Sequence, residues 1–221
     1  MTNTKLNQIN QHIEQIIQQD RQNGDLKSIL MQQYGFRGAD WVAHHCNYLQ
    51  AYIQFAPGNL INMWKAAHAY GREKEIAPIV DMLIHYFFKS DDYIPDRFGA
   101  IGWLDDAYLC NYTLELINRK CKTQFGYHLL DFDFEPCNAA VAPFLGNTLQ
   151  AIQRDAEQAV NKTENWNAVE LLAGAVIGGL LLYGMMNSGN NNSSGSGGGS
   201  YSRQVDSQIA ALTSGTDLYP F

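Results

Sequence analysis

Apolar residues recur at every third or fourth position along most of the first 122 residues, the spacing that puts side chains on one face of an α-helix. The clearest stripe runs through a Gln-rich segment and consists of Leu6, Ile9, Ile13, Ile16 and Ile17. Pro57 ends one predicted helix, and Pro78 places the start of another close to itself, because proline is tolerated only in the first turn. The pattern predicts helices over 1–36 (broken at Asn23-Gly24), 40–54, 60–70, 75–88, 104–121 and 147–166.

The pattern changes after residue 122, and again at the apolar run near residue 167. Residues 123–147 are less regular, and Asp131 to Glu135 alternate like a short strand or an extended loop. The sequence therefore predicts a mainly α protein: a compact helical domain with a helix–corner–helix motif, then a single C-terminal apolar helix and a flexible tail. Its expected parts are a helical region (1–74), a helical hairpin (75–122), an irregular segment with a polar helix (123–166), an apolar helix (167–187), a Gly/Ser/Asn linker (188–202) and a tail (203–221).

The predicted apolar helix gives the clearest indication of where in the cell the protein lies. Leu171 to Met186 form a run of sixteen residues without a charge, slightly shorter than the roughly 20 that a membrane span needs. We interpret residues 168–186 as a transmembrane helix; the alternative is a buried core or oligomer helix. Gly174 and Gly178 form a GxxxG pattern, which lets two helices approach closely in lipid and indicates a homo-oligomer.

Charge and cysteine content narrow the function further. The formal net charge of −7 argues against a nucleic-acid partner, which needs a basic face. The first residues lack the apolar core of a signal peptide, so we expect a cytoplasmic N-terminal domain, a single membrane pass and reduced thiols. The four cysteines are too far apart for a zinc finger and are expected to be small buried residues: Cys46, Cys110, Cys121 and Cys137.

The most specific local feature is DDYIPDRFGAIGWLDDAYL at 91–109, whose residues 91–106 we term the aspartate corner. Pro95 ends the helix before it, and Gly99 and Gly102 permit turn geometry. Asp105 and Asp106 fall in the first turn of the next helix, where carboxylates meet free N–H groups and the positive end of the helix dipole.

This segment resembles the YkvA-like family of bacterial domains of unknown function. The family pattern reads roughly D-x-I-P-D, a short apolar segment, then G-x-L-D-D-A, and the resemblance covers about residues 75–115 only. The matching positions are Asp92, Ile94, Pro95, Asp96, Gly102, Leu104, Asp105, Asp106 and Ala107. Arg97 departs from the pattern, which favours an apolar residue there, and indicates a more exposed loop. The resemblance implies a helical hairpin and a membrane association, but no established activity.

The aspartates have two interpretations. Carboxylates suit Mg²⁺, Ca²⁺ or Mn²⁺, so Asp92, Asp96, Asp105 and Asp106 form an alternative divalent-cation site. We favour helix capping and a hydrogen-bonded corner, because no His or Glu joins the cluster at ligand spacing and Asp is common in caps and turns. We therefore expect no cofactor.

Three groups of histidines invite other chemistry. His85 lies in the apolar helix beside the aspartate corner, and we expect a buried, hydrogen-bonded core residue. His44, His45 and Cys46 are adjacent on a helix and so should not face each other as a catalytic pair. His128 precedes three acidic residues of the segment 131–135, which we interpret as a chance grouping in a loop.

Together these observations predict a membrane-anchored helical protein of the bacterial inner membrane. It would serve as an interaction or scaffold module, with the lipid bilayer and an unidentified protein as partners. One alternative is a divalent-metal-dependent hydrolase that uses the aspartates with His85 nearby. A weaker one is a small pore-forming or toxin-related protein built on the glycine-rich helix.

Overall fold

The computed structural model describes residues 2–89, 93–126 and 128–162, and this part of the chain is mainly helical, without a strand. The prediction of a mainly α protein is confirmed for these residues. The three longest helices are α1, α3 and α5. The α-helices are α1 (Thr2–Asn23), α2 (Asp25–Tyr34), α3 (Ala39–Ala69), α4 (Glu73–Tyr86), α5 (Leu104–Phe125), α6 (Glu135–Val141) and α7 (Leu149–Asn161), with 3-10 segments η1 (Gly35–Arg37), η2 (Asp96–Trp103) and η3 (Ala142–Thr148).

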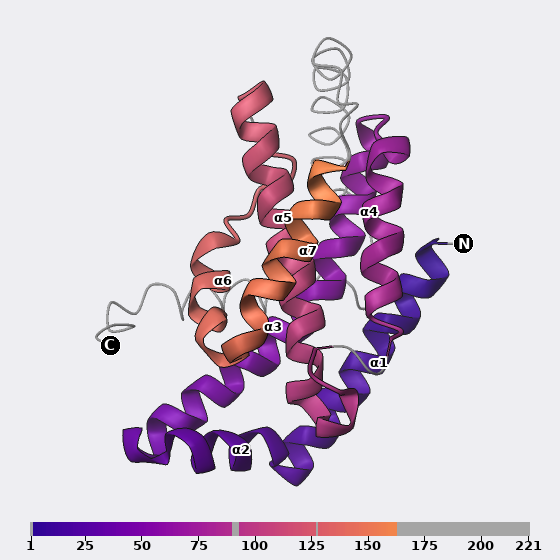
Figure 1. The fold of residues 1–221 in the computed structure, drawn as a ribbon. Helices are drawn as coiled ribbons and strands as arrows, with labels where there is room; N and C mark the ends of the chain where they lie inside the picture. Colours follow the sequence, from indigo (N-terminus) through magenta and orange to yellow (C-terminus); the bar gives the residue numbers. More distant parts are fainter. Residues whose placement is uncertain (1, 90–92, 127, 163–221) are drawn as a thin grey trace, which may run out of the picture.

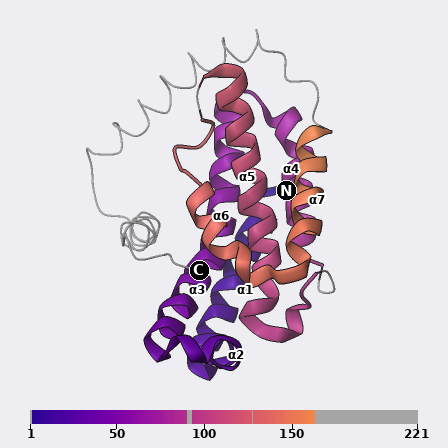
Figure 2. The ribbon, with the colours of Figure 1, turned by 60° about the vertical axis from the view of Figure 1, so that its left-hand side comes forward.

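The long helices pack side by side and α2 lies across one end of the bundle (Figure 1). Helix α5 is central, since it contacts α3, α4, α6 and α7, while α1 packs on α3. A second view shows the same arrangement, with the C-terminal end of α7 at the end of the molecule opposite α2 (Figure 2). One end of the bundle therefore carries α2 and the start of α3, and the other carries the last described residues.

A single apolar core runs through the bundle, from Leu6 of α1 to Val160 of α7. The predicted stripe of α1 is confirmed: Leu6, Ile9, Ile13 and Ile17 are at most 1% exposed. Each such side chain stabilises the fold by about 1.5–3 kcal/mol relative to an exposed position. The break at Gly24 is also confirmed, because this residue has a φ of 72° between α1 and α2.

The helix end predicted at Pro57 is wrong, whereas the helix start predicted at residue 75 lies within two residues of the observed one. Helix α3 is 31 residues long and contains Pro57 in its interior, and α4 begins at Glu73, five residues before Pro78. An interior proline costs a helix about 3 kcal/mol through the missing N–H and a steric clash. In α3, Ile53 and Leu60 are buried on either side of Pro57, so burying the unbroken helix offsets that cost.

The irregular region is a loop followed by helix α6. Of the two interpretations of residues 131–135, the extended loop is confirmed up to residue 134 and the strand is wrong. Asn118 of α5 fixes this loop: its side-chain amide donates to the carbonyl oxygens of Leu130 (2.9 Å) and Phe132 (3.1 Å), and its Oδ1 accepts the Leu130 N–H (2.9 Å). These bonds occupy the backbone groups that a strand partner would otherwise have paired.

None of the helices within the described residues combines the length and the apolar character that a membrane crossing requires. The predicted span 168–186, its glycines Gly174 and Gly178, the linker and the tail all lie outside the described residues. Asp91 and Asp92 of the aspartate corner lie outside them as well.

Candidate functional site

The aspartate corner joins α4 to α5 through the 3-10 segment η2. The turn begins at Pro95, whose carbonyl oxygen accepts the Phe98 N–H at 3.0 Å. Gly99 then adopts φ 70° and ψ −141°, a conformation open mainly to glycine. Arg97 and Phe98 are exposed, as the departure from the family pattern indicated. The predicted helix–corner–helix therefore matches the described residues.

Gly102 is where the corner closes on itself. A Cβ atom at this position would lie 2.6 Å from the Pro95 carbonyl oxygen and 2.8 Å from the Asp96 Cα atom. Both contacts are with backbone, which cannot rotate out of the way as a side chain does. The glycine of the motif is therefore required by the close approach of two backbone segments rather than by its own φ angle.

Asp105 and Asp106 lie in the first turn of α5, as predicted, and each is only 2% exposed. The Oδ2 atom of Asp105 accepts the Ile94 N–H at 2.9 Å, across the corner. This hydrogen bond ties the start of α5 to the residue before Pro95, and the helix dipole favours both carboxylates there. Asp105 thus acts on the backbone of the corner, and both carboxylates lie inside the fold.

Asp96 is half-buried and borders a hollow of about 480 Å³ between the corner and helices α1 and α2. Asp20 and Asp25 also line it, but Asp20 already accepts the Leu26 N–H (2.8 Å) and the Gln50 side-chain amide (2.6 Å). Among the described residues, no three His, Cys, Asp or Glu side chains are arranged to hold a metal ion. The set proposed from sequence also includes Asp92, which is not described.

The expectation for His85 is wrong, because its side chain is exposed on α4. Two tyrosines, rather than His85, connect α4 and the corner to helix α7. The hydroxyls of Tyr86 and Tyr93 both donate to Oδ2 of Asp155 on α7, at 2.6 and 2.7 Å. Burial, followed by the hydrogen bond to Asp155, raises the pKa of Tyr93 to about 12.

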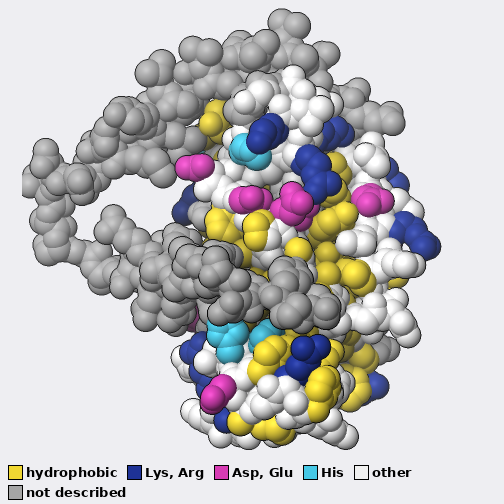
Figure 3. Space-filling model, turned by 90° about the vertical axis from the view of Figure 1, so that its left-hand side faces the viewer, with side chains coloured by type: hydrophobic (Ala, Val, Ile, Leu, Met, Phe, Trp, Pro, Cys, Tyr) yellow, Lys and Arg dark blue, Asp and Glu magenta, His cyan; other side chains and the backbone are white. Residues whose placement is uncertain are grey.

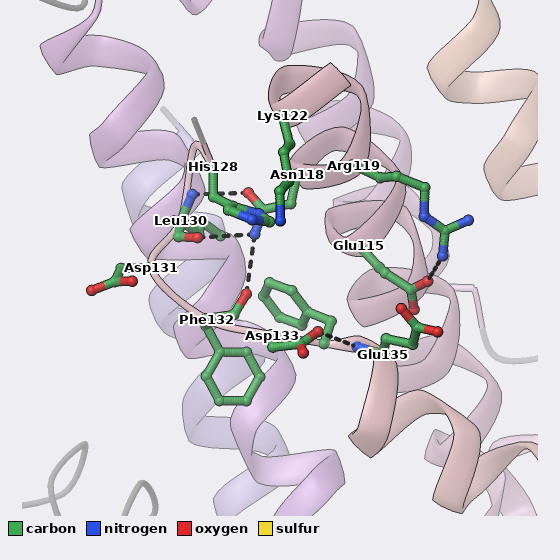
Figure 4. A pocket seen from close by; sticks show the side chains of 11 residues that line it. Glu115, Asn118, Arg119, Lys122, His128, Leu130, Asp131, Phe132, Asp133 and Glu135 are labelled. Atoms are coloured by element: carbon green, nitrogen blue, oxygen red, sulfur yellow. Dashed lines mark hydrogen bonds and ion pairs between the residues drawn. The ribbon is translucent and has the colours of Figure 1, made fainter. Parts of the chain in front are cut away.

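A second candidate site lies between α5 and the loop before α6 (Figure 4). This pocket of about 400 Å³ is lined by side chains of both charges, and the face that carries it shows basic side chains and a histidine above a row of acidic ones (Figure 3). We term it the α5 pocket. Its charged and polar lining consists of Glu115, Asn118, Arg119, Lys122, His128, Asp131, Asp133 and Glu135.

The base of the α5 pocket is a buried hydrogen-bonded network. Glu115, 7% exposed, is paired with Arg119 and accepts the Asn138 side-chain amide at 2.7 Å. Tyr52 donates in turn to Oδ1 of Asn138 at 2.6 Å. Burial is the main cause that raises the pKa of Glu115, and the nearby carboxylate of Glu135 raises it further.

The sequence interpretation of the His128 segment as a chance grouping missed this pocket. The structure brings His128 and the three following acidic residues to the pocket beside the polar face of α5. A signal was present: Glu115, Asn118, Arg119 and Lys122 recur at positions i, i+3, i+4 and i+7 and so share one helix face. Only the fold, however, shows that this face borders the loop.

A third feature is an aromatic patch at the α2 end, in which Tyr34, Trp41, His45 and Phe144 pack on one another. We include the exposed ring of Phe36, two residues after Tyr34 in the chain. Trp41 and His45 stack at 3.7 Å between ring centroids, and Phe144 packs on Tyr34, Trp41 and His45. Phe36 is 80% exposed, an unusual environment for a large aromatic ring. Burial lowers the pKa of His45, which favours its neutral form in this stack.

The cysteines follow the sequence expectation: all four are free and buried. Burial raises the pKa of the Cys46 thiol, and Cys46 packs in the core whereas His45 stacks on Trp41. A thiol with a raised pKa is a poor nucleophile at neutral pH. The adjacent His and Cys residues therefore do not form an activated pair.

Comparison with known proteins adds no relative. A scan against protein-family models, a search of curated proteins and a search of solved structures each gave no match.

Proposed function

We propose that residues 2–162 form a helical interaction module that residues 168–186 hold at a bacterial inner membrane, with the module on the cytoplasmic side. The observation that carries this proposal is the use of the motif aspartates. Asp105 and Asp106 are almost fully buried, and Asp105 bonds the Ile94 N–H. Carboxylates in this setting shape the fold, which supports a structural module over a hydrolase that presents them to a substrate.

The membrane part of the proposal rests on the sequence. The run from Leu171 to Met186 carries no charge, and an apolar stretch of this length is costly in water unless lipid or protein covers it. The resemblance of residues 75–115 to the YkvA-like family supports the same location. GxxxG at Gly174 and Gly178 supports self-association of the anchors within the bilayer.

The aromatic patch supports a protein partner. Aromatic side chains, Tyr and Trp above all, are enriched at the centres of protein–protein interfaces, and exposed apolar patches mark such sites. The patch lies at the α2 end, opposite the C-terminal end of α7, where the segment leading to the anchor begins (Figures 1 and 2). A module anchored through that segment would present the patch away from the bilayer.

Cell fractionation tests the anchor. The full chain and a version that ends at Asn161 are expressed in bacteria, and the membranes are washed with high salt and then with carbonate. We expect only the full chain to stay in the washed membrane. If both versions are released, the apolar run is buried in a fold or an oligomer, and the anchoring proposal is wrong.

Site-specific crosslinking tests the partner. A photo-crosslinking residue replaces Arg37, next to the exposed ring of Phe36, and in a control replaces the exposed Gln11 of α1. We expect a discrete adduct from position 37 that disappears when Phe36→Ser is added, and none from position 11. Equal adducts at both positions, or none at position 37, would contradict docking through the patch.

A further inference from the structure

The charges of the α5 pocket are sorted into two ends. Lys122 and His128 lie at one end, and Glu115, Asp133 and Glu135 converge at the other (Figure 4). Arg119 also lies at the acidic end, where it is paired with Glu115, so the carboxylates of Asp133 and Glu135 remain in excess there. Asp131 belongs to the same loop, but its carboxylate points away from the others (Figure 4). A ligand in this pocket would meet a positive potential at one end and a negative potential at the other.

The helix that forms one wall sets the distance between the two ends. Glu115 and Lys122 are seven residues apart on α5, so about two helical turns, or about 10 Å, separate their backbones. Glu135 lies beside Glu115, close enough to raise its pKa. The pocket therefore fits a ligand whose two charges are several bonds apart, rather than a compact ion.

Some charges of the pocket are engaged within the fold and others are available. Glu115 is paired with Arg119 and Asn138, and Asp133 accepts the Glu135 N–H at 3.1 Å. Within the described residues, the side chains of Glu135 and Lys122 form no hydrogen bond or ion pair. One carboxylate and one ammonium group thus face the pocket ready for a ligand.

The walls of the pocket are held in place before a ligand arrives. Asn118 fixes the loop through three hydrogen bonds to the backbone of Leu130 and Phe132. Phe134, at the base, is 2% exposed and packs on Phe132 with ring centroids 4.8 Å apart. A preformed site loses little conformational entropy on binding, which favours affinity for a small molecule.

We propose that the α5 pocket binds a small extended zwitterion, such as an ω-amino acid or a short peptide, with its ammonium group on Glu135 and its carboxylate on Lys122. His128 adds a hydrogen-bond donor at the carboxylate end, and Asp133 and Glu115 strengthen the field at the ammonium end. Pairing both ligand charges satisfies two side chains that have no partner among the described residues.

Calorimetric titration of the full chain with three matched probes tests the ligand chemistry. 6-Aminohexanoate carries both charges, hexylamine only the ammonium group and hexanoate only the carboxylate. We expect 6-aminohexanoate to bind at least about tenfold more tightly than either single-charge probe. Absence of 6-aminohexanoate binding, or equally tight binding of hexylamine, would overturn the proposal; the second result would indicate a plain cation site.

Charge-neutralising variants then locate the site. Glu135→Gln and Lys122→Gln alter exposed side chains, and each should weaken 6-aminohexanoate binding about tenfold or more. Asp81→Asn removes the same charge from an exposed position on α4 that does not line the pocket, so it should change the affinity less than about twofold. An equal loss in all three variants would show a diffuse electrostatic effect and overturn the assignment.

Discussion

Replacement of Gly102 by alanine tests whether the aspartate corner depends on close backbone contact. The added methyl group would lie 2.6 Å from the Pro95 carbonyl oxygen, well inside the usual carbon–oxygen contact distance. The corner must therefore open, and the shift of residues 95–96 also strains the hydrogen bond between Ile94 and Asp105. Overpacking costs about 1–3 kcal/mol and a weakened buried hydrogen bond about 1 kcal/mol more. We expect Gly102→Ala to lower the free energy of unfolding by about 2–4 kcal/mol.

Gly58 supplies the matched control. It lies inside α3, and a Cβ atom there would meet no other atom within 4 Å. Gly58→Ala should raise the free energy of unfolding by about 0.5–1 kcal/mol, because alanine favours the helix and restricts the unfolded chain. The same substitution is thus expected to have opposite signs at the two positions.

Urea unfolding followed by tryptophan fluorescence measures both effects, and Trp103, which belongs to the corner and is 3% exposed, is a suitable reporter. The expected loss for Gly102→Ala corresponds to a midpoint about 1–2 M lower in urea. If Gly102→Ala is as stable as the native chain while Gly58→Ala behaves as expected, the argument from backbone contact is wrong.

Three further outcomes follow from the contacts. Asp105→Ala leaves the half-buried Ile94 N–H without this acceptor and should cost about 1–3 kcal/mol in urea unfolding, more than Asp105→Asn, which keeps an oxygen; equal costs would contradict this role. Asn118→Ala should speed hydrogen exchange of the Leu130 amide about tenfold or more, without a similar change in α1. Burial raises the pKa of Cys121 to about 12, so the unfolded chain loses this proton first and the urea midpoint should fall from about pH 8.5 upward; a constant or rising midpoint would refute this.

The features that the sequence predicted well are local ones. The α1 stripe needs only helical spacing, and the placement of Asp105 and Asp106 in the first turn of α5 needs only the rules for helix termini. The corner itself was visible because Pro95 and the glycine positions punctuate a short segment. All three features depend on interactions between residues close together in the sequence, so the sequence alone is enough to predict them.

The predictions fail where contacts between residues far apart in the sequence determine the structure, or where a residue lies on the exposed face of a helix. Pro57 stays inside α3 because burial along the whole helix outweighs a local penalty, which no window of sequence contains. The α5 pocket exists because Asn118 holds a loop twelve residues away. His85 did have a local signal: the charged Asp81 lies four residues before it, and both side chains are exposed on α4.

The two tyrosines on Asp155 have a mechanical consequence. Tension applied to the chain beyond α7 would enter the bundle along that helix and reach Asp155 less than two turns from its end. There it would divide between Tyr86 on α4 and Tyr93 of the aspartate corner. A Tyr86→Phe Tyr93→Phe chain should therefore release α7 at a lower pulling force in single-molecule extension, even where its equilibrium stability changes little.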